Sequence, residues 1–273
     1  MKDINCIICN KNEFELFSTF NLNTGNYTLV KCIKCDFVFL NPRINEEDIS
    51  KFYDSNYQPF HKKISFINII YKFLRKVNFF LKYRIITKYI INKGTNLDLG
   101  SGDNFFSKSM NSNGWKSFNY DKYYISNSNI RDLSSFKSNS FNSITLWHSI
   151  EHMYDINSIF KNINKLLTKD GYLFIACPNL NASEIQYLKN NWIAFDIPRH
   201  LYHFNFNTMQ KFLNKNNFKI VNIENLKMDS LFNIFMSKNT NVLYKIFIYL
   251  DSLIVQYLNK KKSSTIVYIC KLK

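Results

Sequence analysis

The sequence lacks the segments that would export the chain or hold it in a membrane. Its first residues, MKDINCIICN, contain no apolar stretch after a basic one and therefore do not form a secretory signal. No segment approaches the roughly 18 uncharged apolar residues that a membrane span requires. Internal repeats and low-complexity linkers are also absent. We therefore expect a globular protein of the cytoplasm, at most peripheral to a membrane.

Acidic residues are scarce as well. The 273 residues include 20 Asp and Glu against 36 Lys and Arg, a net charge of +16. A basic surface can attract nucleic acid, but lysine greatly outnumbers arginine and no arginines are clustered. Asn, Ile, Phe and Tyr are abundant throughout, which is typical of a biased composition, so the charge alone does not predict a nucleic-acid partner. Hydrophobic residues make up 46% of the chain, which is enough for a packed core. The length suits one α/β domain and a small module.

Four of the six cysteines form two CxxC pairs, Cys6 with Cys9 and Cys32 with Cys35. This spacing is typical of a structural zinc site, in which four thiolates leave no position for water. The segment between the pairs reads as two strands around a turn at Thr24-Gly25, so we expect a zinc ribbon over residues 1–43 with one structural Zn²⁺. A redox CxxC or buried thiols are the alternatives. The two remaining cysteines lie in apolar runs without an evident partner, which suits a reducing compartment.

The next segment is expected to be helical. Pro42 and the acidic residues after it predict a helix near 45–54. Residues 64–91 are rich in Ile, Phe, Tyr and Lys at mixed helical spacing and predict one or two amphipathic helices. Together they form a helical linker or lid over residues 44–92. A basic amphipathic helix can also lie on a membrane surface.

After Gly94 the pattern alternates between strands and helices. Strands are predicted at 95–99, 115–120, 143–147, 171–177, 218–224 and 265–272, with a further short apolar segment ending near Asp132, and helices near 104–113, 156–167 and 208–216. Such alternation predicts an α/β fold with a Rossmann-like, seven-stranded, mostly parallel sheet and helices on both faces. We expect a ligand-binding domain over 93–226, followed over 227–273 by C-terminal helices and the last strand of the sheet.

Acidic residues and glycines mark the carboxyl ends of the predicted strands. Asp98 ends the first strand, and Gly100 and Gly102 lie in the turn that opens the next helix. A dinucleotide fold would require a third glycine, whereas the preceding carboxylate suits a ligand with a cationic end. Asp121 ends the next strand, where it can accept both hydroxyls of a ribose, and Asp132 can accept from an adenine amino group. Each feature alone is commonly a plain turn or a solvated loop aspartate. Together they mark the carboxyl ends of successive strands, which is where α/β sheets bind ligands.

The chain resembles class I S-adenosylmethionine-dependent methyltransferases, specifically the type with a zinc ribbon that is associated with sugar and surface-polysaccharide modification. The resemblance covers KCIKCDFVFLNPR, FYDSNY, LDLGSGDN, LWHSIEH, LLTKDGYLFIACPN and IPRHLYHF. It implies that Asp98, Gly100 and Gly102 line the methionine side of the cofactor, Asp121 the ribose and Asp132 the adenine. We add their neighbours Ser101, Leu133 and Trp147 to the cofactor-binding set.

Two positions depart from the pattern of this family. Asn104 stands where the family commonly has another glycine, and Asn142 stands where an aspartate usually precedes the fourth strand. Asn104 could narrow the cofactor turn, although asparagine tolerates unusual backbone angles. These departures leave weak cofactor binding as an alternative.

The segment HSIEH, residues 148–152, also fits the HxxEH pattern of a zinc peptidase family, which needs both histidines on one face of a helix. It directly follows a predicted strand, however, and no third zinc ligand is evident. We therefore expect His148 beside the methyl donor. A purely structural role is the alternative for Glu151 and His152.

The segment IPRHLYHF supplies the remaining catalytic candidates, His200, Tyr202 and His203. Histidine titrates near neutral pH and can remove a proton during methyl transfer. His200 is the preferred base because it resembles the histidine of the EH element in related sugar C-methyltransferases. The alternative is a loop histidine that only packs or caps.

The resemblance implies O-methylation of a sugar, a nucleotide-sugar or a surface glycan by direct displacement with a histidine base. O-methylation is preferred because the sugar C-methyltransferases carry a further C-terminal domain that this chain lacks. One alternative is an RNA base methyltransferase, which the charge favours. Another is a non-catalytic binding scaffold, for which Asn104 and Asn142 are the evidence. The apolar residues in 231–258 predict helices over the sheet, with a lid or a lipid contact as alternatives.

Overall fold

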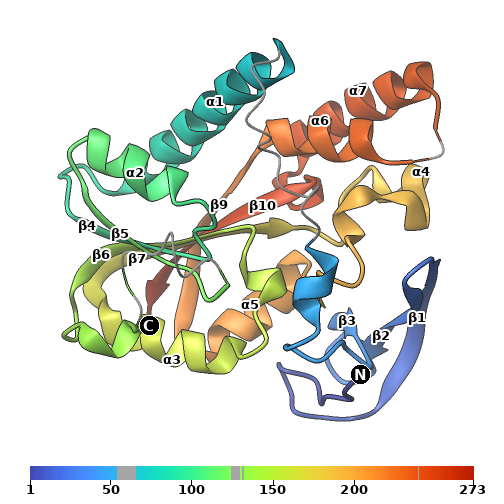
Figure 1. The fold of residues 1–273 in the computed structure, drawn as a ribbon, viewed down its shortest axis with the longest axis horizontal. Helices are drawn as coiled ribbons and strands as arrows, with labels where there is room; N and C mark the ends of the chain where they lie inside the picture. Colours follow the sequence, from blue (N-terminus) through green and yellow to red (C-terminus); the bar gives the residue numbers. More distant parts are fainter. Residues whose placement is uncertain (54–65, 124–129, 131, 239) are drawn as a thin grey trace.

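The computed structural model describes residues 1–53, 66–123, 130, 132–238 and 240–273. The end of the FYDSNY motif and most of the apolar segment expected before Asp132 therefore lie outside the described residues. Within them, two sheets and a set of helices surround the core (Figure 1).

The central sheet has six strands in the described part of the chain, in the order β5-β4-β6-β7-β10-β9. These strands are β4 (Thr95–Leu99), β5 (Lys116–Tyr120), β6 (Phe141–Trp147), β7 (Leu167–Pro178), β9 (Phe218–Asn225) and β10 (Thr265–Leu272). Strand β4 pairs parallel with β5 and β6, and β6 pairs parallel with β7, whereas β10 pairs antiparallel with both β7 and β9. The predicted mostly parallel sheet is confirmed, with six described strands in place of the seven expected.

Helices cover both faces of this sheet, as predicted. In Figure 1, α1 (Phe66–Tyr89) and α2 (Phe105–Ser112) lie on one face, and α3 (Ile156–Leu166) and α5 (Phe206–Lys215) lie on the other. Successive residues of a strand point to opposite faces, and β7 is buried on both. Leu173 and Ile175 therefore join one hydrophobic cluster, and Phe174 and Ala176 join the other.

The C-terminal helices α6 (Lys227–Met236) and α7 (Val242–Leu258) lie on the same side of the sheet as α1 (Figure 1). They confirm the helices predicted for this stretch. Short helical turns complete the described chain: η1 (Ile49–Phe52), η4 (Leu133–Ser135), η5 (Ile150–His152), α4 (Ile185–Leu188), η6 (Lys189–Asn191), η7 (Ile193–Phe195) and η8 (Lys260–Lys262). Among the described helices, none combines the length and the apolar character needed to cross a membrane.

Side chains at the helix starts explain several boundaries. Asn205 accepts a hydrogen bond from the backbone of Thr208, whose hydroxyl bonds back, and this capping box begins α5 two residues before the predicted position. The helix predicted near 45–54 is wrong within the described residues, where only η1 forms. Asp48 precedes η1 but does not cap its backbone, because its carboxylate accepts from Lys51 Nζ at 2.6 Å instead.

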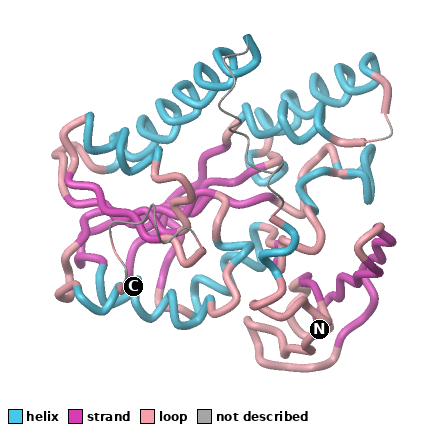
Figure 2. The backbone as a smooth tube through the Cα atoms, viewed as in Figure 1, coloured by secondary structure: helices cyan, strands magenta, loops and turns pink. Residues whose placement is uncertain are grey.

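The second sheet has four strands in the described part of the chain, in the order β1 (Phe14–Leu22), β2 (Gly25–Cys32), β3 (Val38–Leu40) and β8 (Tyr202–His203). Its N-terminal strands are drawn in magenta near the N label in Figure 2. The hairpin of β1 and β2 turns through Asn23 and Thr24, between the paired residues Leu22 and Gly25, one position before the predicted Thr24-Gly25. Strand β8 comes from the IPRHLYHF segment and pairs Val38 with His203. The cysteine-bearing module is therefore joined by backbone pairing to the segment that carries His200.

Candidate functional site

The turn after β4 has the shape of a ligand cradle. Gly100 has a φ of 73°, and a Cβ placed there would lie 2.3 Å from Cβ of Ser149, so only glycine fits. Gly102 has a φ of 53°, but no atom lies within 4 Å of where its Cβ would be. The backbone is thus exposed toward open space at Gly102, where a ligand can approach. Asn104, which begins α2, adopts the left-handed conformation with a φ of 62°, so it takes the backbone role of the missing glycine.

Asp98, Asp121 and Asp132 are at the carboxyl edge, as the sequence predicted. Asp98 is buried and accepts from Thr145 Oγ1 at 2.9 Å, and burial raises its pKa to about 7. Asp121 Oδ2 accepts from the backbone N–H of Gly102 at 2.9 Å. Asp132 is exposed, and its carboxylate accepts from the Ser134 N–H at 2.8 Å. Asn142 is at the opposite end of its strand, where its Oδ1 accepts from the Thr95 N–H at 2.9 Å, so it cannot affect a ligand at this edge directly.

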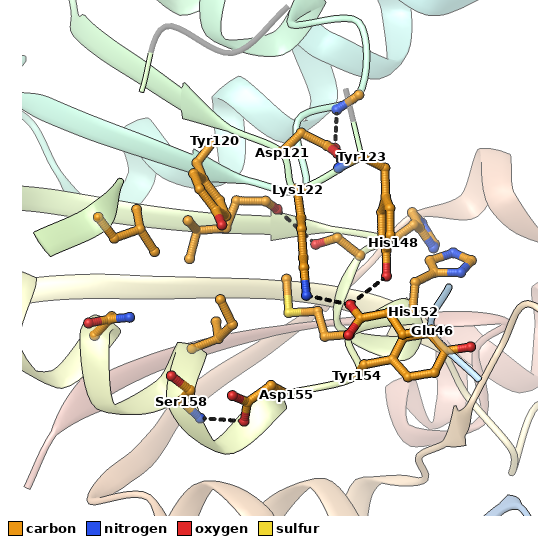
Figure 3. A pocket seen from close by; sticks show the side chains of 18 of the residues that line it. Glu46, Tyr120, Asp121, Lys122, Tyr123, His148, His152, Tyr154, Asp155 and Ser158 are labelled. Atoms are coloured by element: carbon orange, nitrogen blue, oxygen red, sulfur yellow. Dashed lines mark hydrogen bonds and ion pairs between the residues drawn. The ribbon is translucent and has the colours of Figure 1, made fainter. Parts of the chain in front are cut away.

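Two cavities lie at this edge, and both have Gly100 in their walls. The first, the Asp121 cavity, has a volume of about 600 Å³, and Figure 3 shows it from close by. Its wall includes Gly102, Asp121, Asp132, Leu133, His148, His152 and Tyr154. The second, the Lys82 cavity, has a volume of about 710 Å³, and its wall includes Lys82, Asp98, Ser101, Trp147 and Asp229. The predicted cofactor residues are therefore divided between two adjoining spaces.

The Lys82 cavity carries charges of both signs, which sequence reasoning missed. Lys82 projects from α1, and its Nζ lies 5.0 Å from the centre of the Trp147 ring. Burial lowers the pKa of Lys82, while Asp229 and Asp98 act to raise it. The Nε1–H of Trp147 is buried and has no hydrogen-bond partner among the described residues. A cation, a carboxylate and an unpaired donor in one cavity suit a zwitterionic ligand end such as an amino acid. The sequence of the basic helix predicted over 64–91 contains no pattern that distinguishes Lys82 from its other lysines.

His148 is held between two carboxylates. Its Nε2 lies 2.8 Å from Asp229 Oδ2, and its Nδ1 lies 3.6 Å from Glu151 Oε1. Burial acts to lower the pKa of His148, but Asp229 and Glu151 outweigh it and raise the pKa to about 9. The imidazole is therefore protonated at neutral pH. Because a protonated ring has no free lone pair, it can donate a proton or stabilise negative charge but cannot accept a proton.

The motif HSIEH does not form the helix that a zinc peptidase requires. His148 has a φ of 53° and precedes the three-residue turn η5. The structure instead brings Glu151 and His152 together with His200. One potential ligand atom from each of the three lies within 4.8 Å of the others. We call Glu151, His152 and His200 the carboxylate–histidine cluster.

The candidates of IPRHLYHF are buried around this cluster. His200 is 7% exposed, and its Nδ1 lies 2.9 Å from the carbonyl oxygen of Ala194. The hydroxyl of Tyr202 accepts from Arg43 Nη1 at 3.1 Å. Burial lowers the pKa of His203 to about 3, so that ring is neutral. Among the residues of the carboxylate–histidine cluster, only His152 belongs to the wall of the Asp121 cavity formed by described residues. The ring centre of His152 lies 4.6 Å from the ring centre of His200.

The far end of the Asp121 cavity was not predicted from the sequence. Glu46 accepts from Tyr123 OH at 3.0 Å and from Lys122 Nζ at 2.5 Å (Figure 3). The hydroxyl of Tyr53, the residue after η1, lies 3.3 Å from His152 Nδ1. Aromatic and charged groups from the linker and the sheet edge thus share one wall. No single local motif joins them, because they come from separate parts of the chain, and only Tyr53 belongs to a motif named above, FYDSNY.

The four cysteines of the CxxC pairs come together as the spacing predicted. Their Sγ atoms all lie within 4.8 Å of one another, with Cys6 3.4 Å from Cys35 and Cys9 3.5 Å from Cys32. Tetrahedral zinc with Zn–S bonds of about 2.3 Å separates its sulfurs by about 3.8 Å. The four residues therefore fit a metal of this kind with little movement.

The fold and the site define a class of protein: a Rossmann-like enzyme that binds a nucleoside-containing ligand at the carboxyl edge of its sheet. The model of the Methyltransferase domain family matches residues 66–223, more than half of the chain. The chain belongs to this family and is a class I S-adenosylmethionine-dependent methyltransferase.

Two solved structures are similar to this chain. The PH0226 protein of Pyrococcus horikoshii OT3 is 15% identical, with a TM-score of 0.50, and the match covers 81% of this chain and 99% of that one. An S-adenosylmethionine-dependent methyltransferase of Archaeoglobus fulgidus is 16% identical, with a TM-score of 0.49 and coverage of 72% and 93%. Among curated proteins, none matches the sequence.

Proposed function

We propose that the enzyme transfers a methyl group from S-adenosylmethionine to a hydroxyl of a sugar, a nucleotide-sugar or a surface glycan. The observation that carries the proposal is the wall of the Asp121 cavity, where Tyr53, His148, His152 and Tyr154 lie in the same space as the candidate ribose ligand. Rings with polar tips offer both an apolar face and hydrogen-bonding groups, which suit the faces and hydroxyls of a sugar.

The donor would bind across both cavities. The candidates that bind its ribose and adenine are Asp121, Asp132 and Leu133. The candidates that bind its methionine end are Asp98, Gly100, Ser101, Gly102 and Trp147. We add Lys82, because a buried ammonium can pair with the methionine carboxylate while Asp98 faces the amino group. The donor supplies a sulfonium methyl, and the protein aligns the acceptor for direct displacement.

The acceptor hydroxyl must lose a proton as the methyl group is transferred. We assign this step to the carboxylate–histidine cluster, with His200 as its essential member. His148 is protonated and therefore has an electrostatic role beside the reacting groups. Tyr202 and His203 position the loop, since both belong to β8 and pair with the N-terminal sheet.

The experiment is transfer of a labelled methyl group from S-adenosylmethionine to a panel of nucleotide-sugars and lipid-linked glycans. We expect turnover with at least one of them, and His200→Ala should lower turnover by about 10² to 10⁴. Asp170→Asn, at an exposed position of β7, serves as the control and should leave turnover unchanged. Near-normal turnover in His200→Ala would refute the role of the cluster. Methylation of RNA alone, with a steep salt dependence of binding, would refute the sugar acceptor.

We further propose that Cys6, Cys9, Cys32 and Cys35 hold one structural Zn²⁺. Its role would be to fix the N-terminal sheet, since four thiolates leave no open position for catalysis. Through β3 and β8 this sheet pairs with the segment that follows His200. The metal would therefore support the site without taking part in the chemistry.

We place the reaction in the cytoplasm, at the surface of a membrane when the acceptor is lipid-linked. Helix α7 supports this placement because Leu243, Phe247, Leu250 and Ile254 form one stripe and are 80%, 52%, 55% and 62% exposed. The net charge of +16 complements anionic lipid. Co-sedimentation with anionic vesicles tests the placement: Leu250→Lys with Ile254→Lys should weaken it, and no sedimentation of the wild type would refute it.

A further inference from the structure

We propose that the carboxylate–histidine cluster is a second metal site, for a divalent transition-metal ion with open coordination positions. It consists of Glu151, His152 and His200, each with one potential ligand atom within 4.8 Å of the other two. The cluster shares no residue with the four-cysteine site. The binding of the ion does not depend on the proposed function, whereas its part in the reaction does.

Glu151 is the first observation that points to a cation. Its side chain is 1% exposed, and neither carboxylate oxygen has a hydrogen-bond partner among the described residues. The nearest ionisable group recorded is His148, whose Nδ1 lies 3.6 Å from Oε1. The His148 imidazolium offsets part of the charge of the carboxylate from beyond hydrogen-bond distance. A buried carboxylate whose two oxygens lack hydrogen bonds remains costly unless a cation binds it directly.

The two histidines are the second observation, because their ring orientations are fixed by backbone carbonyls. His152 Nδ1 lies 3.1 Å from the Arg199 oxygen, and His200 Nδ1 lies 2.9 Å from the Ala194 oxygen. A carbonyl oxygen only accepts, so a hydrogen on Nδ1 satisfies the carbonyl in each ring. At His152 the Tyr53 hydroxyl lies 3.3 Å from the same nitrogen and would compete as a donor only in the other tautomer. In the neutral ring the lone pair is then on Nε2. Metal-bound histidines show this arrangement, with one nitrogen donating to a carbonyl and the other on the ion.

One neighbour competes with a metal for this lone pair. Asp196 Oδ2 lies 3.5 Å from His200 Nε2. If His200 were protonated, it would pair with Asp196 and could not bind an ion. Asp196 Oδ1, however, already accepts from the Arg199 guanidinium at 2.5 Å, so part of its charge is compensated. The ion pair and the metal site are mutually exclusive, and metal content distinguishes them.

The ligand set indicates the class of ion. Two imidazole nitrogens and one carboxylate oxygen suit Zn²⁺, Fe²⁺, Co²⁺ or Ni²⁺, whereas Mg²⁺ and Ca²⁺ prefer oxygen alone. Three protein ligands also leave at least one position open, as in catalytic zinc sites. His152 belongs to the wall of the Asp121 cavity, so an oxygen of the acceptor can reach that position from the cavity.

A bound cation would explain how the cluster acts on the acceptor. A hydroxyl bound to a divalent metal loses its proton more readily than a free one. His200 would then contribute as a ligand rather than as a free base. Loss of His200 lowers turnover in both cases, so turnover alone does not separate the two roles.

The experiment measures metal content by atomic emission after dialysis of the full chain against a twofold excess of Zn²⁺. We expect two equivalents in the wild type, one at the cysteines and one at the cluster. Glu151→Gln, which keeps the shape of the side chain, and His200→Asn, which keeps a donor near the position of Nδ1, should each hold one equivalent, and Asp170→Asn should hold two. A wild type with one equivalent would overturn the proposal, as would either cluster variant with two.

Dialysis against Co²⁺ gives a second measurement on the wild type that needs no variant. Cobalt bound by nitrogen and oxygen should add weak d–d absorption to the intense thiolate bands of the cysteine site, and absence of this absorption would overturn the proposal. Methyl transfer by protein that lacks the second equivalent would refute the metal's part in the reaction and leave the proposed function standing. Two equivalents of metal without transfer to any acceptor would leave the metal site standing and refute the proposed function.

Discussion

Nε2 of His148 lies 2.8 Å from Oδ2 of Asp229. This contact joins the loop after β6 to helix α6, and the two residues are 81 positions apart in the sequence. His148 lines the Asp121 cavity and Asp229 lines the Lys82 cavity, so the pair links the walls of both spaces. His148 has a left-handed backbone conformation, which is strained and persists only where the surrounding structure enforces it. The pair thus helps to shape the region where donor and acceptor would meet.

This pair predicts a pH dependence of stability. The pKa of His148 is raised from 6.5 to about 9, so the stabilisation is fully present below pH 6.5 and is lost as the pH rises through 9. We expect a loss on the order of 2 kcal/mol in the free energy of unfolding, since the side chain is 33% exposed and partly screened. Urea unfolding at pH 6.5 and 9.5 measures it. His148→Gln should lose less over this range, and an equal loss in both proteins would contradict the prediction.

The two glycines of the turn should respond differently to alanine. Gly100→Ala places a Cβ 2.3 Å from that of Ser149, in a left-handed backbone, and should destabilise the fold by about 3 kcal/mol. Gly102→Ala meets no atom within 4 Å, so we expect a cost of only about 1 kcal/mol from the backbone. Its main effect should be weaker binding of S-adenosylmethionine, because the new methyl enters the space that the ligand uses. Urea unfolding and calorimetry separate the two effects, and unchanged affinity in Gly102→Ala would argue against this cradle.

Asp121 should matter for donor affinity. Its carboxylate accepts from the Gly102 N–H and lies in the cavity wall, so Asp121→Ala removes both the support of the turn and the candidate ribose ligand. Hydrogen bonds to a charged group contribute about 1.5–3 kcal/mol, which corresponds to a roughly 10- to 100-fold weaker affinity. Calorimetric titration with S-adenosylmethionine measures the change, with Asp170→Asn as the control. An affinity within about twofold of the wild type would remove Asp121 from the site.

The cysteine site should lose its metal as a unit. Cys9→Ser removes one of four ligands, so we expect one equivalent of zinc fewer and a less stable N-terminal sheet. Cys177→Ala, which lies outside the four-cysteine site, should keep the metal content of the wild type. Atomic emission on purified protein provides the measurement. Less than half an equivalent of zinc in the wild type would contradict the assignment.

Much of the fold could be predicted because its signals are local. The alternation after Gly94 gave the order of strands and helices, and the two CxxC pairs brought four sulfurs together as expected. The glycine turn and Asp121 also lie at the predicted edge, since parallel strands bring their carboxyl ends to one side of a sheet.

The rest depended on contacts between distant residues. Lys82 is one of many lysines in a basic helix, and only packing of α1 on the sheet singles it out. His200 lies next to Glu151 and His152 because β8 and the loop after β7 fold back over η5, where the Leu201 N–H donates to the Glu151 carbonyl at 2.8 Å. The charge of His148 depends on Asp229, and no local pattern connects them.

Calorimetric titration of the purified full chain with S-adenosylmethionine tests the donor site itself, on which the proposed methyl transfer depends. We predict saturable binding of one equivalent, abolished or strongly weakened in Asp121→Ala and retained in Asp170→Asn. No detectable heat of binding at millimolar S-adenosylmethionine would contradict it and would favour a scaffold in which the cofactor turn no longer binds its ligand.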